Sequence, residues 1–338
     1  MKWLASACLG VLASALLFAA QAQPARLNGG GGTAVYPVMS MWAQDYQRKT
    51  NIAVNYQTIG SGGGIRQSMA RTIDFGNSDK PLDHAALARA KLAQFPVLII
   101  AIVPVVYLPG FKSGELFLDG PTLARIYLGK ITRWDDPALR SLNPGVTLPA
   151  LPIVVVHRSD ASGTTFHFTN YLGKVSPAWK ADVGADVSVA WPLGSAAKGN
   201  AGVVATLQQI KGAIAYVEHA YAKLSHLTLV GMINRDGGRV LPDVASFRAA
   251  ARQAGYTKDF RFNLIDQPGR ASWPLLSPTY MLIRTDAPGE TNRAILKFLD
   301  YGMRQGRPAA ERLQYLPLPE PVVEQVEAAW SDQLHAWP

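Results

Sequence analysis

The sequence predicts an α/β protein that is divided into two lobes. Strand-like and helix-like segments alternate along the chain, a pattern typical of largely parallel sheets flanked by helices. The chain has 338 residues, and chains longer than roughly 250 to 300 residues normally divide into two domains. An apolar stretch at 95–107, interrupted by two prolines, is shorter than the roughly 20 residues that a membrane span needs. We therefore interpret it as a long buried strand that runs between the two lobes.

The N-terminal segment at 1–22 has the composition of a secretory signal peptide. A lysine at position 2 precedes an apolar run at 3–20, and the small-x-small pattern AQA ends at Ala22, after which we expect cleavage. A membrane anchor is the alternative, but the run is short and no basic flank follows it. Lipid anchoring through Cys8 is disfavoured because this residue lies before most of the apolar run.

Removal of the signal would leave residues 23–338, a chain of 316 residues without cysteine. An exported protein without disulfides must be stabilised by its core alone, and this length can bury enough apolar surface. The mature chain would carry 32 basic and 24 acidic residues, a net charge of +8, which favours anionic partners through long-range attraction. The basic residues form no run of five, which argues against a nucleic-acid-binding tail or a polybasic membrane patch.

The helices are predicted from apolar spacing and from residues that favour helix starts. Val38, Trp42 and Tyr46 recur at four-residue intervals, after a proline suited to a first helical turn. Asp83 is placed to cap a helix expected at 82–92. Further helices are expected at 65–69, 121–129, 163–172, 202–209, from 221, at 292–304, and at the C-terminus, where Val322, Val326, Trp330 and Leu334 form an apolar stripe.

Strands are expected where short apolar or β-branched runs occur, at 52–56, 73–76, 95–107, 151–156, 213–217 and 277–283. The last of these could return the chain to the first lobe. We expect the first lobe to contain residues 23–100 and 278–338, and the second lobe to contain 101–277.

Three segments rich in glycine, serine and threonine are expected to form turns where helices begin, at 29–33, 60–64 and 159–165. Helix N-termini present free N–H groups and a partial positive charge, and therefore hold anions. Glycine allows the backbone to approach closely, and the hydroxyls add directed donors. One such turn is commonly only a helix cap, but three in one chain indicate an anion site.

Arg158 follows the strand expected at 151–156, at the edge of the sheet where ligands of open α/β folds bind. Its planar guanidinium can hold an oxyanion at two points. Asp160 could hold that guanidinium in place, although a purely structural ion pair in a turn is the alternative.

Asp79 is unusual among these donors because a carboxylate repels a bound anion unless the anion has a proton to donate. Phosphate carries such a proton at neutral pH and sulfate does not. We therefore predict that Asp79 accepts the proton of a bound phosphate. A turn or helix-cap aspartate is the alternative.

These segments make the chain recognisable, together with several other short motifs: NYQTIGSGGG at 55–64, DFGNSD at 74–79, KSGEL at 112–116, IYLGKI at 126–131, WDD at 134–136, RSDASGTT at 158–165, KGN at 198–200, GAIAYVE at 212–218 and WP at 273–274. The chain resembles the periplasmic phosphate-binding proteins of high-affinity phosphate ABC importers, over nearly the whole mature sequence. The resemblance implies a two-lobed periplasmic-binding-protein fold that closes over inorganic phosphate. It also implies a periplasmic location and a membrane permease as partner.

By the same resemblance, the family's ligand contacts fall on eight positions: Thr33, Ala34 (through its backbone N–H), Ser61, Asp79, Arg158, Ser162, Gly163 and Thr164. Asp160 matches the acidic residue that pairs with the binding arginine. The chain departs from the family pattern where Ala34 replaces an aromatic residue, where Ala161 replaces a common glycine, and where Gly62 replaces a common serine. Loss of the aromatic predicts a looser or wetter wall and weaker affinity.

A hydrolase is the first alternative, because Ser162 has His157 and Asp160 nearby in the sequence. If the strand extends through Arg158, alternation turns His157 away from Ser162. We expect His157 at a strand end and His167 on a helix surface. The six histidines show no metal-ligand spacing, so neither a metal nor another cofactor is expected.

A receptor for sulfate or molybdate is the second alternative, and a structural or adhesive protein is the third. Sulfate and molybdate binders can rely on neutral donors, whereas Asp79 and Arg158 together favour a protonated, multiply charged anion. We expect a monomer, since a receptor must present both lobes to its transporter.

Overall fold

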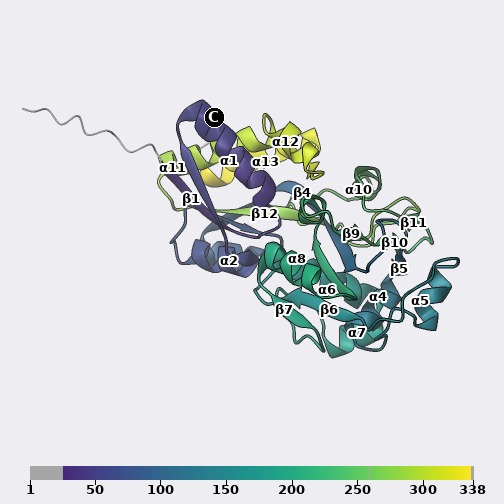
Figure 1. The fold of residues 1–338 in the computed structure, drawn as a ribbon. Coiled ribbons are helices and arrows are strands. Elements are labelled where there is room, and N and C mark those ends of the chain that lie inside the picture. The colour runs from purple at the N-terminus through teal and green to yellow at the C-terminus, as the bar shows by residue number, and fades with distance from the viewer. Residues whose placement is uncertain (1–25, 258, 336–338) are drawn as a thin grey trace, which may run out of the picture.

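The computed structural model describes residues 26–257 and 259–335 (Figure 1). The predicted signal peptide and its cleavage site lie outside the described residues. Within the part that the structure describes, no helix has the length and apolarity that crossing a membrane requires.

The strands are β1 (Arg26–Gly31), β2 (Ala53–Thr58), β3 (Phe75–Ser78), β4 (Leu92–Tyr107), β5 (Phe117–Asp119), β6 (Val154–Arg158), β7 (Ser195–Ala197), β8 (Ala213–Glu218), β9 (Thr228–Leu229), β10 (Gly231–Ile233), β11 (Arg239–Val240), β12 (Leu276–Arg284) and β13 (Leu316–Pro317). The helices are α1 (Tyr36–Thr50), α2 (Gly60–Met69), α3 (His84–Ala90), α4 (Gly120–Tyr127), α5 (Pro137–Leu142), α6 (Gly163–Val175), α7 (Pro177–Asp182), α8 (Gly199–Gln209), α9 (His219–Leu224), α10 (Val244–Ala251), α11 (Gly289–Met303), α12 (Arg307–Arg312) and α13 (Glu320–Leu334).

The main sheet has the strand order β2-β1-β3-β12-β4-β8-β6-β7, and β9 and β13 also pair with β4. The outer strands run parallel: β1 pairs with β2 and β3, and β6 pairs with β7 and β8. The two central strands, β4 and β12, are antiparallel to each other. The predicted α/β class is therefore confirmed, with helices covering sheets whose outer strands are parallel.

Strand β4 connects the two halves of the sheet, as predicted for the apolar stretch at 95–107. Its residues 92–101 pair with β12, and its residues 102–107 pair with β8. All of its side chains except Tyr107 are buried. We refer to the half that contains β1, β2, β3 and β12 as the first lobe and to the half that contains β6, β7 and β8 as the second.

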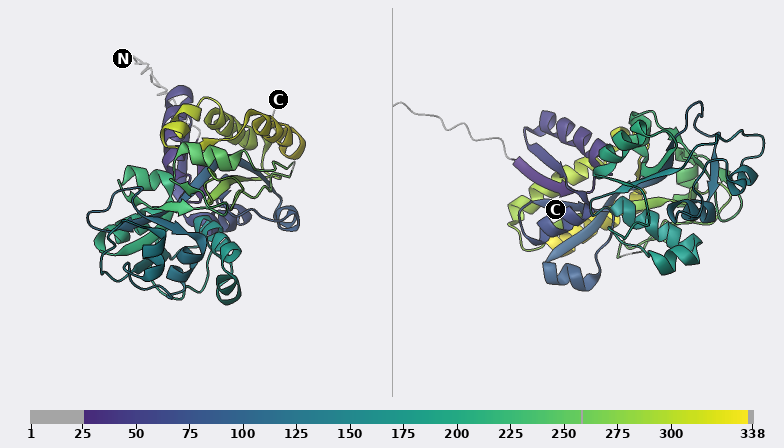
Figure 2. Two further views of the ribbon diagram at one scale, coloured as in Figure 1. Left: turned by 90° about the vertical axis from the view of Figure 1, so that its right-hand side faces the viewer. Right: turned by 60° about the horizontal axis from the view of Figure 1, so that its bottom comes forward.

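Figures 1 and 2 show how helices cover the two lobes. Helix α1 and the C-terminal helices α11, α12 and α13 gather on one side of the first lobe, and α2 lies on the other side, next to the second lobe (Figure 1). The predicted apolar faces of α1 and α13 are buried, including Trp42 and Trp330. Asp83 caps α3 as expected, accepting a hydrogen bond from the Ala86 N–H at 2.7 Å.

Two of the three predicted glycine-rich turns are instead parts of regular elements. Residues 29–31 lie in β1, and residues 60–64 form the first turns of α2. A Cβ atom at Gly64 would lie 2.8 Å from the Cα atom of Gly31, and one at Gly31 would collide with the Asn77 backbone. These glycines therefore allow α2 to pack directly on β1 and β3. In the sequence, glycines in this role cannot be distinguished from glycines in a turn.

Candidate functional site

The predicted site residues come together between the two lobes. Thr33 and Ala34 lie in the connection from β1 to α1, Ser61 in the first turn of α2, and Asp79 directly after β3. Arg158 ends β6, and Ser162, Gly163 and Thr164 begin α6. All eight residues are buried. The exposed fraction is no more than 5% for the seven that have a side chain: Thr33, Ala34, Ser61, Asp79, Arg158, Ser162 and Thr164.

Ser61 joins the two lobes by accepting two hydrogen bonds. The Asp79 N–H of the first lobe donates to the Ser61 Oγ atom at 3.2 Å, and the Gly163 N–H of the second lobe donates to the same atom at 3.0 Å. Nearby, the Gly62 N–H donates to the Ala161 carbonyl at 3.0 Å. With these contacts formed and the site residues buried, the structure shows the lobes in a closed arrangement.

The predicted pair between Arg158 and Asp160 is present. The Arg158 Nε and Nη2 atoms donate to the two carboxylate oxygens of Asp160 at 2.7 and 2.5 Å, and the Gly199 N–H donates to Asp160 Oδ1 at 2.9 Å. Burial alone would raise the pKa of Asp160, but Arg158 and the Gly199 amide outweigh it, so this pKa lies below its usual value. Asp160 is therefore ionised at neutral pH.

The second terminal nitrogen of Arg158 is the strongest sign of a ligand. The Nη1 atom is buried and has no hydrogen-bond partner among the described residues. A buried charged donor without a partner is costly, so this nitrogen calls for an acceptor that the protein itself does not supply.

Asp79 is the one acceptor among these donors. Its Oδ1 atom accepts a hydrogen bond from the Thr279 hydroxyl at 2.7 Å, which leaves Oδ2 available. Burial raises the pKa of Asp79 to about 6, against the hydrogen bond from Thr279 and the attraction of Arg158, which both lower it. A Cβ atom added to Gly163 would lie 2.7 Å from Asp79 Oδ2, so this oxygen faces the second lobe.

The structure adds a residue that sequence reasoning missed. Asn200, at the start of α8, is fully buried. Its backbone N–H and its Nδ2 atom both donate to the Thr33 Oγ1 atom, at 3.3 and 2.9 Å. Its Oδ1 atom accepts the Glu218 N–H at 3.0 Å. The only sequence signal for Asn200 was the KGN motif at 198–200. The motif alone does not predict that Asn200 contacts Thr33.

The backbone of 32–34 is held by three tyrosines that were also not predicted. The Tyr56, Tyr221 and Tyr315 hydroxyls donate to the carbonyls of Gly32, Thr33 and Ala34 at 2.8, 3.0 and 2.7 Å. The Tyr315 oxygen also lies 3.2 Å from Glu218 Oε2. Burial raises the pKa of Glu218 well above its usual value, despite the hydrogen bond from the Ala220 amide that lowers it. This support fixes the direction in which the Ala34 N–H points.

Of the two histidines near the site, one lies where we expected it and the other does not. His157 lies at the end of β6, where its ring stacks on Trp191 with a centroid distance of 4.7 Å. His167, which we expected on a helix surface, is only 8% exposed. Its Nε2 atom lies 2.8 Å from the Asp79 carbonyl oxygen of the other lobe. The expectation was wrong because α6 packs against the first lobe. The first lobe covers the helix face that carries His167, and the spacing of apolar residues within α6 does not predict this contact.

A cavity of about 410 Å³ lies at the mouth of the site and is lined by residues of both lobes, including Thr33, Tyr36, Asp160, Lys198 and Tyr221. Among the described residues, no group of three or more histidine, cysteine, aspartate or glutamate side chains could hold a metal ion. The site therefore presents a guanidinium, several hydroxyl and amide donors, and one carboxylate. This combination suits a small tetrahedral oxyanion that still carries a proton.

Proteins named as phosphate-binding proteins are similar to this chain over most of its length. Residues 19–304 match the model of the PBP superfamily domain. The chain is 46% identical over 318 residues to the phosphate-binding protein PstS of Xylella fastidiosa strain 9a5c, and the alignment covers 93% of this chain and 87% of the relative. It is 44% identical over 329 residues to the PstS of Pasteurella multocida strain Pm70, with coverage of 96% and 95%. This chain belongs to the PstS family.

A solved structure with the same fold as this PstS family member is the ABC-type phosphate transport receptor of Vibrio cholerae. It is 19% identical and superposes with a TM-score of 0.54, covering 87% of this chain and 100% of the receptor chain. This similarity confirms the predicted two-lobed architecture.

Proposed function

We propose that this protein binds inorganic phosphate between its two lobes and delivers it to the membrane permease of an ABC importer. The observation that carries the proposal is the pairing of opposite chemistries in one buried site. Among the described residues, Arg158 offers a buried donor without a partner, and Asp79 offers a carboxylate oxygen that faces the second lobe. Only an anion that also carries a proton satisfies both groups. The names of the PstS relatives support the same ligand.

The proposed phosphate ligands are the eight predicted positions: Thr33, Ala34, Ser61, Asp79, Arg158, Ser162, Gly163 and Thr164. Their burial where the two lobes meet supports this assignment. The Ser162 Oγ atom accepts the Thr165 N–H at 3.1 Å, which leaves its own proton for an anion. The Gly163 N–H already donates to Ser61, so its contact with phosphate requires that it share or exchange this bond. Asp160 supports Arg158 and is not itself a ligand.

We propose that the protein acts without catalysis. Ser162 would need a base, and the nearby His157 ring stacks on Trp191 while its Nδ1 atom lies 3.1 Å from the Arg158 carbonyl oxygen. Burial lowers the pKa of His157 against that backbone contact. Membership of a family of binding proteins supports the same conclusion.

We further propose export to the periplasm, with cleavage of the signal peptide after Ala22, and function as a monomer. The change of partner strand along β4 between Ala101 and Ile102 supports a first lobe of 23–100 and 278–338 and a second lobe of 101–277. Delivery of a small ion by a two-lobed receptor requires opening and closing about β4 and β12, the two central strands.

Isothermal titration of the mature protein, stripped of bound ligand, tests the proposal. We expect phosphate to bind with a Kd of about 1 μM or tighter, which corresponds to about −8 kcal/mol. Absence of heat and of a thermal shift with millimolar phosphate would exclude phosphate as the ligand. Release of p-nitrophenol from its phosphate ester would instead indicate an enzyme. A smaller radius of gyration with phosphate than without it, measured by X-ray scattering, is expected for closure.

A further inference from the structure

The Thr33 hydroxyl can form only one further hydrogen bond. Two donors of Asn200, its backbone N–H and its Nδ2 atom, both point to the Thr33 Oγ1 atom. A hydroxyl has one proton and two lone pairs, so both lone pairs are occupied. Thr33 can therefore act toward a ligand only as a donor.

The amide of Asn200 cannot turn to present its oxygen instead. Its Oδ1 atom accepts the Glu218 N–H at 3.0 Å, on the side opposite Thr33. A turned amide would place its NH₂ group against the Glu218 N–H, and its oxygen would then compete with phosphate for the Thr33 proton. Asn200 is completely buried, so water cannot compensate for such an arrangement. The end of β8 thus determines which atom faces Thr33.

Ser61 shows the same arrangement with different partners, because its Oγ atom accepts the Asp79 and Gly163 amides. In each case a first-lobe hydroxyl receives a hydrogen bond from a helix start of the second lobe: α8 for Thr33 and α6 for Ser61. Closure of the lobes therefore does more than enclose the ligand. It converts two hydroxyls that could donate or accept into groups that only donate.

We propose that Asn200 is a positioning residue of the anion site, which holds the lobes closed through Thr33 and commits the Thr33 hydroxyl to donate to the bound oxyanion. This inference rests on the proposed function, since it assumes that Thr33 contacts phosphate. Asn200 needs no contact with the ligand for this role, because it acts through the Thr33 hydroxyl.

The test is a double-mutant cycle between Asn200 and Thr33, read as the phosphate Kd. We expect Asn200→Ala to weaken binding about ten- to hundredfold, the range of one hydrogen bond to a charged group. In a Thr33→Val background the same substitution should change the Kd by no more than about twofold, because the two residues act as one unit. Equal losses in both backgrounds would overturn the proposal.

Asn200→Asp separates positioning from a merely structural role. Aspartate preserves the shape and the acceptor for Glu218, but it replaces the Nδ2 donor with an acceptor that takes the Thr33 proton. We expect a greater loss of affinity than for Asn200→Ala, and this excess should shrink in the Thr33→Val background. Affinity preserved in Asn200→Asp would contradict the proposal. Asn170→Ala, on α6, is the control, and the wild type must bind phosphate, since its failure would refute the proposed function instead.

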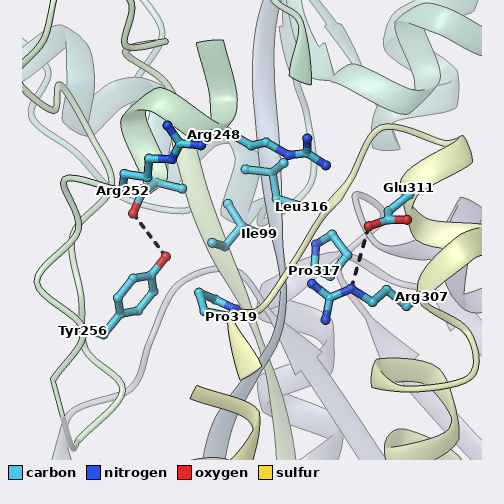
Figure 3. A pocket seen from close by; sticks show the side chains of 10 residues that line it. Ile99, Arg248, Arg252, Tyr256, Arg307, Glu311, Leu316, Pro317 and Pro319 are labelled. Atoms are coloured by element: carbon cyan, nitrogen blue, oxygen red, sulfur yellow. Dashed lines mark hydrogen bonds and ion pairs between the residues drawn. The ribbon is translucent and has the colours of Figure 1, made fainter. Parts of the chain in front are cut away.

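A second inference comes from a cavity of about 320 Å³ on the central strands, lined by a different set of residues from the anion site (Figure 3). Ile99 of β4, Leu316 of β13 and Pro319 form apolar walls. Its volume lies at the lower end of the roughly 300 to 1,000 Å³ of small-molecule sites. The cavity is thus large enough for a compact organic molecule.

Three arginines surround this apolar cavity. Arg248 and Arg252 extend from α10 and its C-terminal end, and Arg307 lies across the opening on α12 (Figure 3). Arg307 forms ion pairs with Glu311 at 3.7 Å and with Glu320 at 3.9 Å. Within the described residues, Arg248 and Arg252 make no side-chain hydrogen bond or ion pair. The positive charge of the rim therefore comes from Arg248 and Arg252, beside an apolar surface. Such a rim complements an anion that has an apolar body.

The cavity also depends on how the lobes are arranged. Arg248 and Arg252 belong to the segment proposed as the second lobe, whereas Arg307 and Leu316 belong to the first. If the cavity changes shape when the lobes open, a molecule held by residues of both segments favours the closed arrangement. By linkage it then tightens phosphate binding by the same factor by which phosphate tightens its own binding.

The geometry points to a second ligand site for a small amphipathic carboxylate, which acts as a positive effector of phosphate binding. Decanoate, decanol and decyltrimethylammonium share an apolar chain of similar length and differ in the charge of the head group. Each is used below its critical micelle concentration, so that a difference in binding reports on charge alone. We expect decanoate alone to give a saturable thermal shift and to lower the phosphate Kd severalfold. Equal shifts with decanol or with the cation, or a phosphate Kd that decanoate leaves unchanged, would overturn the proposal.

Charge reversal locates the site. Arg248→Glu with Arg252→Glu should abolish both effects of decanoate and leave phosphate affinity without decanoate unchanged, because both side chains are exposed. Arg89→Glu, an exposed arginine on α3, is the matched control and should preserve both effects. If the double variant responds to decanoate as the wild type does, decanoate does not bind in this cavity.

Discussion

The two lobes contribute opposite chemistry to the proposed anion site. The second lobe supplies positive potential: the buried Arg158 guanidinium and the N-terminus of α6, where Ser162 caps the helix. The first lobe supplies two neutral hydroxyls and the carboxylate of Asp79. Attraction therefore comes mainly from one side of the site and discrimination from the other.

This difference has a physical basis. A guanidinium attracts any oxyanion, so the second lobe alone cannot distinguish phosphate from sulfate. A carboxylate in a buried site rejects an anion without a proton, because two acceptors are then left facing each other. The first lobe thus gives up some attraction in exchange for selectivity. Variants on the two sides should change affinity and selectivity separately.

The largest effect is expected on the second lobe, at Arg158. Arg158→Ala removes the buried guanidinium that faces the anion, and loss of one partner of a buried charged contact costs roughly 3–5 kcal/mol of binding free energy. This corresponds to a loss of phosphate affinity of about a hundredfold or more. Arg158→Lys should lose less, since only the fork geometry is lost, and Ser162→Ala should lose least. Titration of all three variants gives the order, and equal losses would show that Arg158 is only structural.

Gly163→Ala should show how much phosphate affinity depends on lobe closure, because it adds no charged or polar group to either lobe. An added Cβ atom would lie 2.5 Å from both Asp79 Cβ and Ser61 Oγ, so it obstructs the contact between the lobes without disturbing α6 itself. Crowding of this kind costs roughly 1–3 kcal/mol, or about ten- to hundredfold in affinity.

Gly173→Ala on the same helix is the matched control for closure, because the atoms nearest to its added Cβ are 3.9 Å away. It should bind phosphate as the wild type does. X-ray scattering should show that Gly163→Ala remains open with phosphate. A closed, tightly binding Gly163→Ala protein would mean that the lobes do not need this contact.

Selectivity is expected to depend on Asp79 in the first lobe. We predict that the wild type binds phosphate at least about a thousandfold tighter than sulfate, within the range that rejection by unpaired groups achieves. Asp79→Asn should reduce this ratio by about tenfold or more, because an amide can turn its NH₂ group toward sulfate. Competition titrations of both ions test the prediction. If Asp79→Asn rejects sulfate as strongly as the wild type, selectivity arises elsewhere.

The same carboxyl should make stability depend on pH in the ligand-free protein. Its pKa of about 6 lies above the usual 3.8, so between these values the folded state binds more protons than the unfolded state. The contribution of Asp79 is therefore present in full below about pH 4 and falls as pH rises through about 6, by up to about 3 kcal/mol. The free energy of unfolding of Asp79→Asn should lack this component. Denaturant titrations of both proteins between pH 4 and 7 would reveal any difference in slope.

The sequence by itself determined the class of the fold, most of its elements and the principal charged residues of the proposed site. The apolar run at 95–107 is rich in β-branched residues and interrupted by two prolines, which disfavours a helix, and it forms most of β4. Arg158 and Asp160 are two residues apart at a strand end, so their pairing is a local event that spacing can predict. Proton chemistry alone singled out Asp79, before its neighbours were known.

Only the tertiary structure decided which groups support those residues and how the lobes meet. Asn200 lies 167 positions from its partner Thr33 in the chain, and Thr279 lies 200 from Asp79. No local pattern records contacts of this range. The glycines at 60–64 were misread for a related reason: a residue without a side chain permits either a turn or close packing, and only the neighbouring backbone of β1 and β3 distinguishes the two. His167 likewise became buried because a lobe distant in sequence covers its helix face.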